Sequence, residues 1–159
     1  MSDKEKRSAA LIRAYALERH PEGGWFSEVF TAAEGGERKL AGSIYFLLDR
    51  DDISHFHQID CEELWYFHEG CGLNIYIREA DGSCRTERLG NDFDAGEKPM
   101  VSVGKGAIFA AENLDPTAYT FISCATAPKF SYEGFRLVPR CELSDAAFPE
   151  RLFSDTAGR

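Results

Sequence analysis

Hydrophobic and polar positions alternate with two different periods along the chain. Between Ser8 and Leu17 the sequence is rich in alanine and leucine, and larger apolar side chains recur at helical spacing at Leu11, Ile12 and Tyr15. This pattern predicts a short amphipathic helix over about 8–17. The helix is expected to end at His20-Pro21, because the residue before a proline disfavours helical backbone angles.

After Gly23-Gly24 the pattern changes to short runs rich in β-branched and aromatic residues. The expected strands are Trp25–Thr31, Leu40–Leu48, Glu62–His68, Leu73–Glu79, Ser83–Leu89, Pro99–Val103, Ala107–Ala111, Ala118–Ala125 and Phe135–Val138. Turn signals such as Asp81-Gly82 and Gly90-Asn91 separate them. This spacing is typical of an antiparallel β-sandwich or β-barrel. A final short helix is expected from Ser144 to Leu152, with Ser144 as its N-cap.

The length of 159 residues is typical of one domain, and we find no internal repeat or linker that would divide the chain. We therefore expect a single all-β domain over residues 1–159. In this interpretation the helix comes first, the strands occupy about 25–138, and residues 139–159 form a C-terminal segment.

Charge and cysteine usage restrict the class of protein. Eighteen basic and 27 acidic side chains give a net charge of −9, which disfavours nucleic-acid partners. No apolar run has the length of a membrane-spanning helix, and no signal peptide is recognisable, so we expect a cytoplasmic protein without a membrane partner. The odd number of cysteines, without a CxxC pair, predicts reduced thiols at Cys61, Cys71, Cys84, Cys124 and Cys141.

The densest group of coordinating side chains lies between Ser54 and Gly70. His55 and His57 are two residues apart, so on an extended strand both imidazoles would leave the same face. Two histidines and a carboxylate form the facial set of non-haem iron sites, which makes His55, His57 and Glu62 or Glu63 weak candidates for a divalent transition metal. The alternative is a solvated His-x-His with exposed acids beside it.

These residues resemble the first motif of the cupin superfamily, whose members are small jelly-roll β-barrels. Glu62 fits the histidine spacing of that motif, and Glu63 fits its spacing to Gly70. The second cupin motif resembles the segment from Gly104 to Asn113, which carries phenylalanine at the position of the last metal-binding histidine. That residue is Phe109, and the resemblance therefore implies a cupin without a tightly bound metal.

Further blocks are similar to the "cupin five" group, a domain of unknown function. They are His20-Pro21-Glu22-Gly23-Gly24-Trp25-Phe26, Ile44-Tyr45-Phe46-Leu47-Leu48, Glu63-Leu64-Trp65-Tyr66-Phe67 and Cys124-Ala125-Thr126-Ala127-Pro128. The resemblance covers roughly residues 8–150. It implies a single cupin jelly roll, usually a homodimer, similar in fold to dTDP-4-dehydrorhamnose 3,5-epimerase.

The polar residues of the first block are expected to have a structural role. Gly23-Gly24 allows a turn with positive φ, and His20 and Glu22 are interpreted as turn-stabilising groups rather than catalytic ones. Glu28 alternates with Phe26 and Phe30. Either this face points into the barrel and Glu28 with it, or the register is inverted and Glu28 lies in water.

A small-molecule pocket is expected inside the barrel. Along Glu62–His68 both alternating sets are largely apolar, so the sequence leaves open whether Glu62 or Glu63 points inward. If Glu63 points inward, His68 faces out, and the pocket combines an imidazole, carboxylates and an aromatic wall. The expected ligand-binding residues are Glu28, Trp65, Phe109 and Phe26, and the expected catalytic residues are His57, Glu63 and Tyr45.

Three functions remain open for this pocket. The first is a metal-free sugar or sugar-nucleotide epimerase or isomerase in which His57 takes a proton, Glu63 holds the imidazole and Tyr45 donates a proton. The second is a metal-dependent dioxygenase or isomerase, which Phe109 disfavours. The third is non-catalytic binding of a small polar metabolite. A diphosphate substrate is not favoured, because no cluster of arginine and lysine accompanies these blocks.

Overall fold

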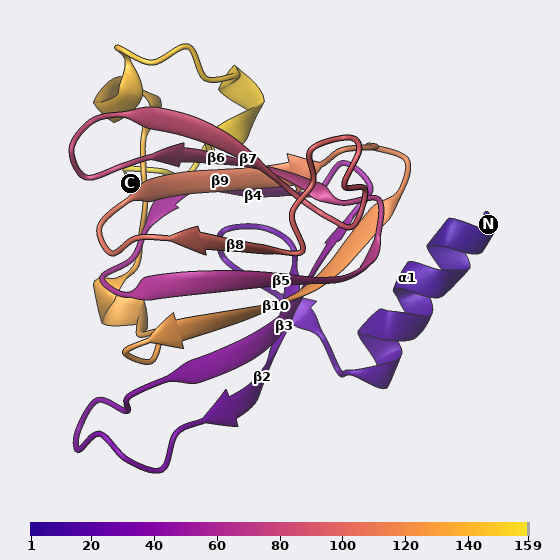
Figure 1. Ribbon diagram of the computed structural model, residues 1–159, viewed down its shortest axis with the longest axis horizontal. Coiled ribbons are helices and arrows are strands. Elements are labelled where there is room, and N and C mark those ends of the chain that lie inside the picture. Colours follow the sequence, from indigo (N-terminus) through magenta and orange to yellow (C-terminus); the bar gives the residue numbers. More distant parts are fainter. Residues whose placement is uncertain (159) are drawn as a thin grey trace.

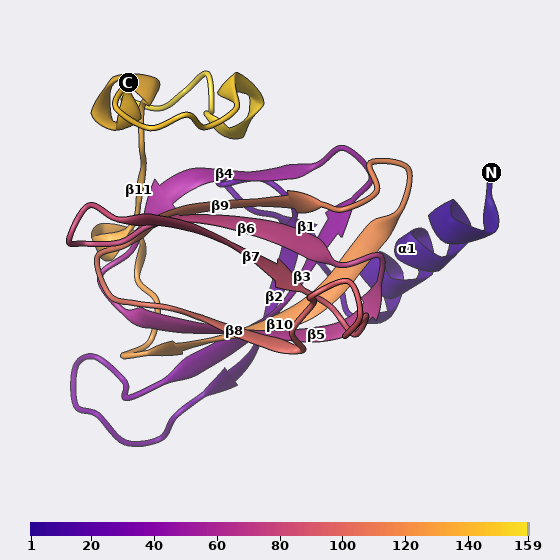
Figure 2. The same ribbon diagram turned by 45° about the horizontal axis from the view of Figure 1, so that its top comes forward.

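The strands form two antiparallel sheets in the computed structural model, which describes residues 1–158. The six-stranded sheet has the order β1 (Glu18–Arg19), β2 (Trp25–Thr31), β3 (Gly42–Asp49), β10 (Tyr119–Ala127), β5 (Glu62–Gly70) and β8 (Met100–Val103). The five-stranded sheet has the order β11 (Arg136–Leu137), β4 (Ile53–Gln58), β9 (Ile108–Asn113), β6 (Leu73–Arg78) and β7 (Cys84–Leu89). Figure 2 shows the sheets as two separate layers.

The connections between strands make the sandwich a jelly roll. The chain crosses from one sheet to the other between β3 and β4, β4 and β5, and β5 and β6, and again at each step from β7 to β10. Neighbouring strands in one sheet are therefore distant in the sequence, as in the pair of β3 and β10. The expected all-β jelly-roll fold is confirmed.

The main hydrophobic core lies between the two sheets, because alternate side chains of each strand face the opposite sheet. Its largest members are Phe46, Leu48, Trp65, Leu73, Ile75, Ile77, Leu89, Phe109 and Ile122. Phe46 and Trp65 come from the six-stranded sheet, and Phe109 comes from the five-stranded one. Aromatic side chains thus fill much of the space between the layers.

The N-terminal helix packs on the outer face of the six-stranded sheet (Figure 1). It is α1 (Asp3–Ala14), and a capping box between Ser2 and Glu5 fixes its start. Leu11 is buried with Leu47 and Phe121 of the sheet. The helix is confirmed, although it begins five residues earlier and ends three residues earlier than about 8–17.

The C-terminal segment covers the outer face of the five-stranded sheet, where Figure 1 shows it in yellow. It contains two 3₁₀ helices, η2 (Arg140–Leu143) and η3 (Glu150–Leu152). The prediction of a helix from Ser144 to Leu152 is wrong, since Ser144 follows η2 as its C-cap. Pro149 explains the interruption, because it lacks a backbone N–H and disfavours helical angles at the residue before it.

The strand that carries His55 and His57 was absent from the predicted set. β4 mixes polar and apolar residues without the run of β-branched or aromatic residues that marked the other strands. The two-residue β1 and the late start of β3 at Gly42 are smaller differences. Within residues 1–158, no helix is long and apolar enough to cross a membrane.

The edges of the six-stranded sheet predict self-association. β1 pairs only with Trp25 and Phe26, and β8 is the last strand at the other edge. Exposed apolar side chains accompany these edges at Val29, Phe30 and Met100. Because free strand edges are normally paired or covered, we expect a two-fold homodimer. Light scattering at micromolar concentration should give the mass of two chains, and the mass of one chain would contradict this prediction.

Candidate functional site

A cavity of about 540 Å³ opens at one end of the sandwich. Its wall combines ionisable groups with aromatic rings. The lining residues that bear on its chemistry are Glu18, His20, Glu22, Phe26, Glu28, Ile44, His57, Ile59, Glu63, Cys124, Lys129, Phe130, Tyr132 and Phe135. Both sheets, the turn before β2 and the segment after β10 contribute to it.

The turn between β1 and β2 carries Glu22 into the sandwich. Gly23 has φ of 108°, and a Cβ at this position would collide with the carbonyl oxygen of Ile53 on β4. The backbone N–H of His55 donates to the carbonyl oxygen of Glu22 at 2.7 Å. The turn is therefore fixed against β4, and the Glu22 side chain is buried.

A bulge in β4 determines which of its side chains point inward. Ser54 pairs with Ala111 and His57 with Phe109, so three steps on β4 match two steps on β9. As a result Ser54 and His57 both reach Glu22 Oε2, the hydroxyl at 3.0 Å and the imidazole Nε2 at 2.7 Å. The bulge overturns the expectation that His55 and His57 share a face.

His57 and Glu22 form a buried ion pair. The Nδ1–H of His57 donates to the backbone oxygen of His55 at 2.7 Å, so the proton shared with Glu22 is the one on Nε2. Burial opposes charge on His57, yet the carboxylate of Glu22 raises its pKa. Burial also opposes ionisation of Glu22, but the charge of His57 and the hydrogen bonds from His57 and Ser54 lower its pKa to about 2.

Glu63 on β5 is the second buried carboxyl group of the cavity, and it is only 8% exposed. Burial and the nearby charge of Glu22 raise its pKa to about 7, against the opposing effects of His57 and a hydrogen bond with the Cys124 thiol. The single imidazolium of His57 therefore faces two carboxyl groups, and it is hydrogen-bonded to only one of them. Glu63 is left as an acid that titrates near neutral pH.

His20 adds a neutral imidazole to the wall. Its Nδ1 accepts the backbone N–H of Glu22 at 3.1 Å, so the ring proton lies on Nε2. Burial lowers the pKa of His20 and outweighs the nearby carboxylate of Glu22, which acts to raise it, and the charge of His57 also lowers it. The neutral ring is thus a hydrogen-bond donor on the lining of the cavity.

The structure brings some of the expected site residues together. His57, Glu63 and Phe26 line the cavity, and the inward residue of the Glu62–Glu63 pair is Glu63. Phe109 is fully buried behind His57, with 4.2 Å between the ring centroids. Trp65 lies deeper in the core, 6.1 Å from the Phe109 ring, and does not line the cavity.

Tyr45 and Glu28 lie elsewhere than expected. Tyr45 alternates with the inward-facing Phe46 on β3, so it projects to the outer face, where its ring packs on Tyr15 at 4.9 Å. Glu28 is at the mouth of the cavity with its side chain 62% exposed, 3.3 Å from Lys129 Nζ. Water and Lys129 satisfy this carboxylate, so it is not carried into the interior.

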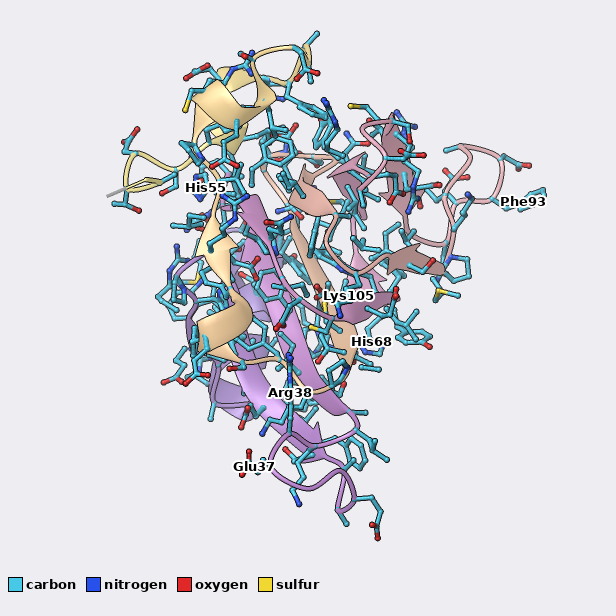
Figure 3. The ribbon with its side chains drawn as sticks, turned by 90° about the vertical axis from the view of Figure 1, so that its left-hand side faces the viewer. Glu37, Arg38, His55, His68, Phe93 and Lys105 are labelled. Carbon is cyan, nitrogen blue, oxygen red and sulfur yellow. The ribbon has the colours of Figure 1, made fainter. Side chains whose placement is uncertain are left out.

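The remaining histidine, His68, projects from the outer face of β5, as expected if Glu63 points inward. Its Nε2 is hydrogen-bonded to the Ser123 hydroxyl, and its ring lies 6.3 Å from that of Tyr45. Figure 3 shows His68 well separated from His55, which lies beside the C-terminal segment. Neither histidine lines the cavity.

Sequence reasoning assigned His20 and Glu22 to a turn and missed their place in the cavity wall. It also missed Cys124 and the three rings that follow β10, Phe130, Tyr132 and Phe135. The available signal was the His-Pro-Glu-Gly-Gly block, because a turn that only reverses the chain does not require a histidine and a glutamate beside its glycine pair.

Comparison with known proteins agrees with this architecture. The sequence matches the family described as Cupin superfamily (DUF985) over residues 9–138. The chain belongs to this cupin family. The resemblance to the "cupin five" group is therefore confirmed, and no curated protein is similar enough in sequence to be counted as a relative.

Two solved structures match most of the chain. A protein from Shewanella oneidensis is 33% identical with a TM-score of 0.85, and the match covers 92% of this chain and 97% of that one. A hypothetical protein from Leishmania major is 28% identical with a TM-score of 0.79, covering 87% and 90%. Oxalate decarboxylase from Bacillus subtilis is 19% identical with a TM-score of 0.56, and the match covers 74% of this chain and 29% of that one, which shows the shared fold alone.

The metal ligands expected from the cupin motif do not converge in this cupin. His55 Nδ1 is 2.9 Å from the backbone oxygen of Glu22, and the exposed Glu62 accepts the backbone N–H of Lys105 at 3.2 Å. The phenyl ring of Phe109 occupies the position of the last histidine and offers no lone pair. Within residues 1–158, no group of three histidine, cysteine or acidic side chains is arranged to hold a metal ion.

Replacing Glu63 by glutamine should stabilise the protein at high pH. In the wild type, folding raises the pKa of Glu63 from 4.5 to about 7. The folded state therefore binds a proton that the unfolded state has lost, and stability falls as the pH rises from about 4.5 to about 7. The full cost of this shift is about 3 kcal/mol above that range.

Urea unfolding of the wild type and Glu63→Gln at pH 4 and pH 8 measures this difference. The variant should be the more stable protein at pH 8, and the gain should shrink towards pH 4. Glu62→Gln, which changes an exposed carboxylate one residue earlier, is the matched control and should show no such dependence. A Glu63→Gln variant that loses stability equally at both pH values would contradict this interpretation of the site.

Proposed function

We propose that this cupin binds a small polar metabolite in the cavity and moves a proton to and from it without a metal, as an isomerase or epimerase does. The observation that carries the proposal is the buried carboxyl group of Glu63 on the cavity wall, which lacks a cationic partner of its own. Leaving a carboxyl group in such a place costs stability, and this cost is typical of a group kept for chemistry or binding.

Glu63 is suited to take a proton from carbon. A general base is most effective when its pKa lies near the working pH, because it is then partly ionised and still basic enough to accept a proton. With its pKa at about 7, Glu63 meets this condition. In the proposed step its carboxylate removes a proton from the carbon beside a carbonyl group, the C–H electrons form a carbon–carbon double bond, and the carbonyl oxygen becomes an enolate oxygen.

His20 is suited to stabilise that oxygen. A neutral imidazole that donates from Nε2 polarises a carbonyl group without first losing charge, and the hydrogen bond from Glu22 N–H fixes this tautomer. Return of the proton from Glu63 to the former carbonyl carbon, with transfer of the proton of the neighbouring hydroxyl group to the enolate oxygen, completes an isomerisation. Return of the proton to the original carbon completes an epimerisation when the enolate first turns its other face to Glu63. Atoms and charge balance in both cases, since Glu63 both takes and returns the carbon-bound proton.

His57 has a different part in this proposal from the proton acceptor that the sequence suggested. Its Nε2–H is hydrogen-bonded to Glu22 and its Nδ1–H to the backbone oxygen of His55, so neither nitrogen is free to accept a proton. Its role is to keep Glu22 ionised and in place. Glu22 in turn raises the pKa of Glu63 and orients His20 through its backbone N–H.

Hydrogen exchange tests this chemistry without knowledge of the natural substrate. The protein is incubated in D₂O with small hydroxy- and amino-carbonyl compounds of positive, zero and negative charge, and deuterium at the carbon beside the carbonyl is followed by NMR. Exchange should rise with pH through about 7 as Glu63 ionises, and Glu63→Gln should lower it by at least about 100-fold. His20→Gln should lower it by less, because it leaves the base in place.

Tyr45→Phe is the control, since Tyr45 projects to the outer face. This variant should catalyse deuterium exchange at the wild-type rate. Exchange that survives in Glu63→Gln would remove this residue from the reaction. If no compound exchanges faster than in buffer while ligands still bind, the cupin is a binding protein rather than an enzyme.

A further inference from the structure

The charged groups around the cavity are mostly acidic. Glu63 and Glu22 lie inside, and Glu18 and Glu28 lie at the mouth. Among the described lining residues, Lys129 is the only lysine or arginine. Its ammonium group lies 3.3 Å from Glu28 and 2.9 Å from the Thr31 hydroxyl, so it is already engaged.

The positive charge of His57 is also unavailable to a ligand. Both of its N–H groups are hydrogen-bonded within the protein, one to Glu22 and one to the backbone oxygen of His55. An anionic ligand would therefore enter an acidic cavity and meet no free cationic donor. Charge repulsion and an unpaired buried anion would both oppose its binding.

Besides these charged groups, aromatic rings line the cavity. The ring of His20 lies 4.7 Å from Phe26, 5.8 Å from Phe135 and 6.0 Å from both Phe130 and Tyr132, measured between ring centroids. The faces of such rings carry partial negative charge and attract cations. Carboxylates and aromatic faces in one cavity are the combination that recognises an ammonium group.

Tyr132 shows that the acidic groups act together at the mouth. It belongs to the short 3₁₀ helix η1 (Tyr132–Gly134), which follows β10. Burial raises the pKa of its phenol, and the charges of Glu18, Glu22 and Glu28 add to this effect. These three carboxylates, all from the segment of β1, the turn and β2, therefore create a negative potential around Tyr132.

The segment that carries Tyr132 is fixed to the rest of the protein. Arg38, in the loop between β2 and β3, donates to the backbone oxygen of Lys129 at 3.0 Å and binds the Asp60 carboxylate at 2.7 and 2.9 Å. Figure 3 shows Arg38 reaching inward from this loop, whereas Glu37 lies further out. The aromatic wall is thus held in place before a ligand arrives, which lowers the cost of ordering it.

We propose that the cavity selects a ligand that carries a positive charge, as an ammonium or protonated amino group. Its cationic group packs against the rings around His20 and supplies Glu63 with the counter-charge that the protein does not. This inference rests on the proposed function in placing the ligand in the same cavity, and it adds the charge of that ligand. Glu22, His57, Cys124 and Cys61 are the ionisable groups that face Glu63, and only His57 among them carries positive charge.

Three molecules of nearly equal shape test the inference. Choline carries a positive charge, 3,3-dimethylbutan-1-ol replaces its nitrogen by carbon and is neutral, and 3,3-dimethylbutanoate is an anion. Binding of each to the wild-type protein is measured by isothermal titration calorimetry at pH 8 and low ionic strength. We expect choline to bind at least about tenfold more tightly than the neutral alcohol, and the anion to bind most weakly.

Two matched pairs of variants locate the effect. Glu63→Gln should lower choline affinity by about tenfold or more and leave the affinity for the neutral alcohol nearly unchanged, whereas the adjacent Glu62→Gln should change neither. Tyr132→Leu should also weaken choline binding, and Tyr66→Leu, on the outer face of β5, should not. Cooperative thermal unfolding of all four variants, with Glu63→Gln unfolding above the wild-type temperature at pH 8, would show that they remain folded.

The inference is overturned if the neutral alcohol or the anion binds as tightly as choline. It is also overturned if choline does not bind at the highest concentration at which the protein stays folded. Preference for choline without deuterium exchange would defeat the proposed chemistry and support the inference. Deuterium exchange that occurs only with neutral or anionic compounds would support the proposed chemistry and contradict the inference.

Discussion

Burying the carboxylate of Glu22 against the imidazolium of His57 requires several parts of the fold to be arranged together. The β4 bulge turns Ser54 and His57 to the same side, and the absence of a side chain at Gly23 lets the turn before β2 approach the Ile53 carbonyl oxygen. Each partner alone would be an unpaired buried charge, and removing one partner of such a pair typically costs about 3–5 kcal/mol. The pair is therefore a constraint on the fold as well as part of the site.

The pair also determines the state of the rest of the cavity. His57 compensates Glu22, so Glu63 remains next to a carboxylate and in a dry environment, and its pKa rises to about 7. The same backbone that carries Glu22 directs a hydrogen bond to His20 Nδ1 and fixes the tautomer of that ring. One ion pair thus prepares a titratable acid and a neutral hydrogen-bond donor on one cavity wall. The aromatic residues after β10 complete the cavity wall.

The sequence predicted more of the fold than of the site, because the fold follows from local patterns and the site depends on contacts between distant residues. Strand periodicity and turn signals are local, so alternation predicted an antiparallel sandwich or barrel, and the cupin motifs added the jelly roll. Alternation did not decide which of Glu62 and Glu63 points inward, because both alternating sets of β5 are largely apolar. The bulge in β4 is not visible as a pattern, and it reversed the relation between His55 and His57. The contact of Glu22 with His57 joins residues that are 35 positions apart. Glu22 lies in a turn, and the glycines of that turn favoured the interpretation that its polar residues are only structural. Tyr45 was misplaced because alternation alone does not say which face of β3 is inside.

The most direct test of this account is a carbon-13 NMR titration of the glutamate carboxyl groups, with Glu22→Gln and Glu63→Gln used to assign the two buried signals. The account predicts that Glu63 titrates at about 7 and Glu22 at about 2, far apart although both face His57. It also predicts that Glu22→Gln lowers the pKa of Glu63, because the neighbouring negative charge is lost and His57 is released to pair with Glu63. A Glu63 signal that titrates near 4.5 in the wild-type protein would contradict the central claim that one imidazolium leaves a second buried carboxyl group uncompensated.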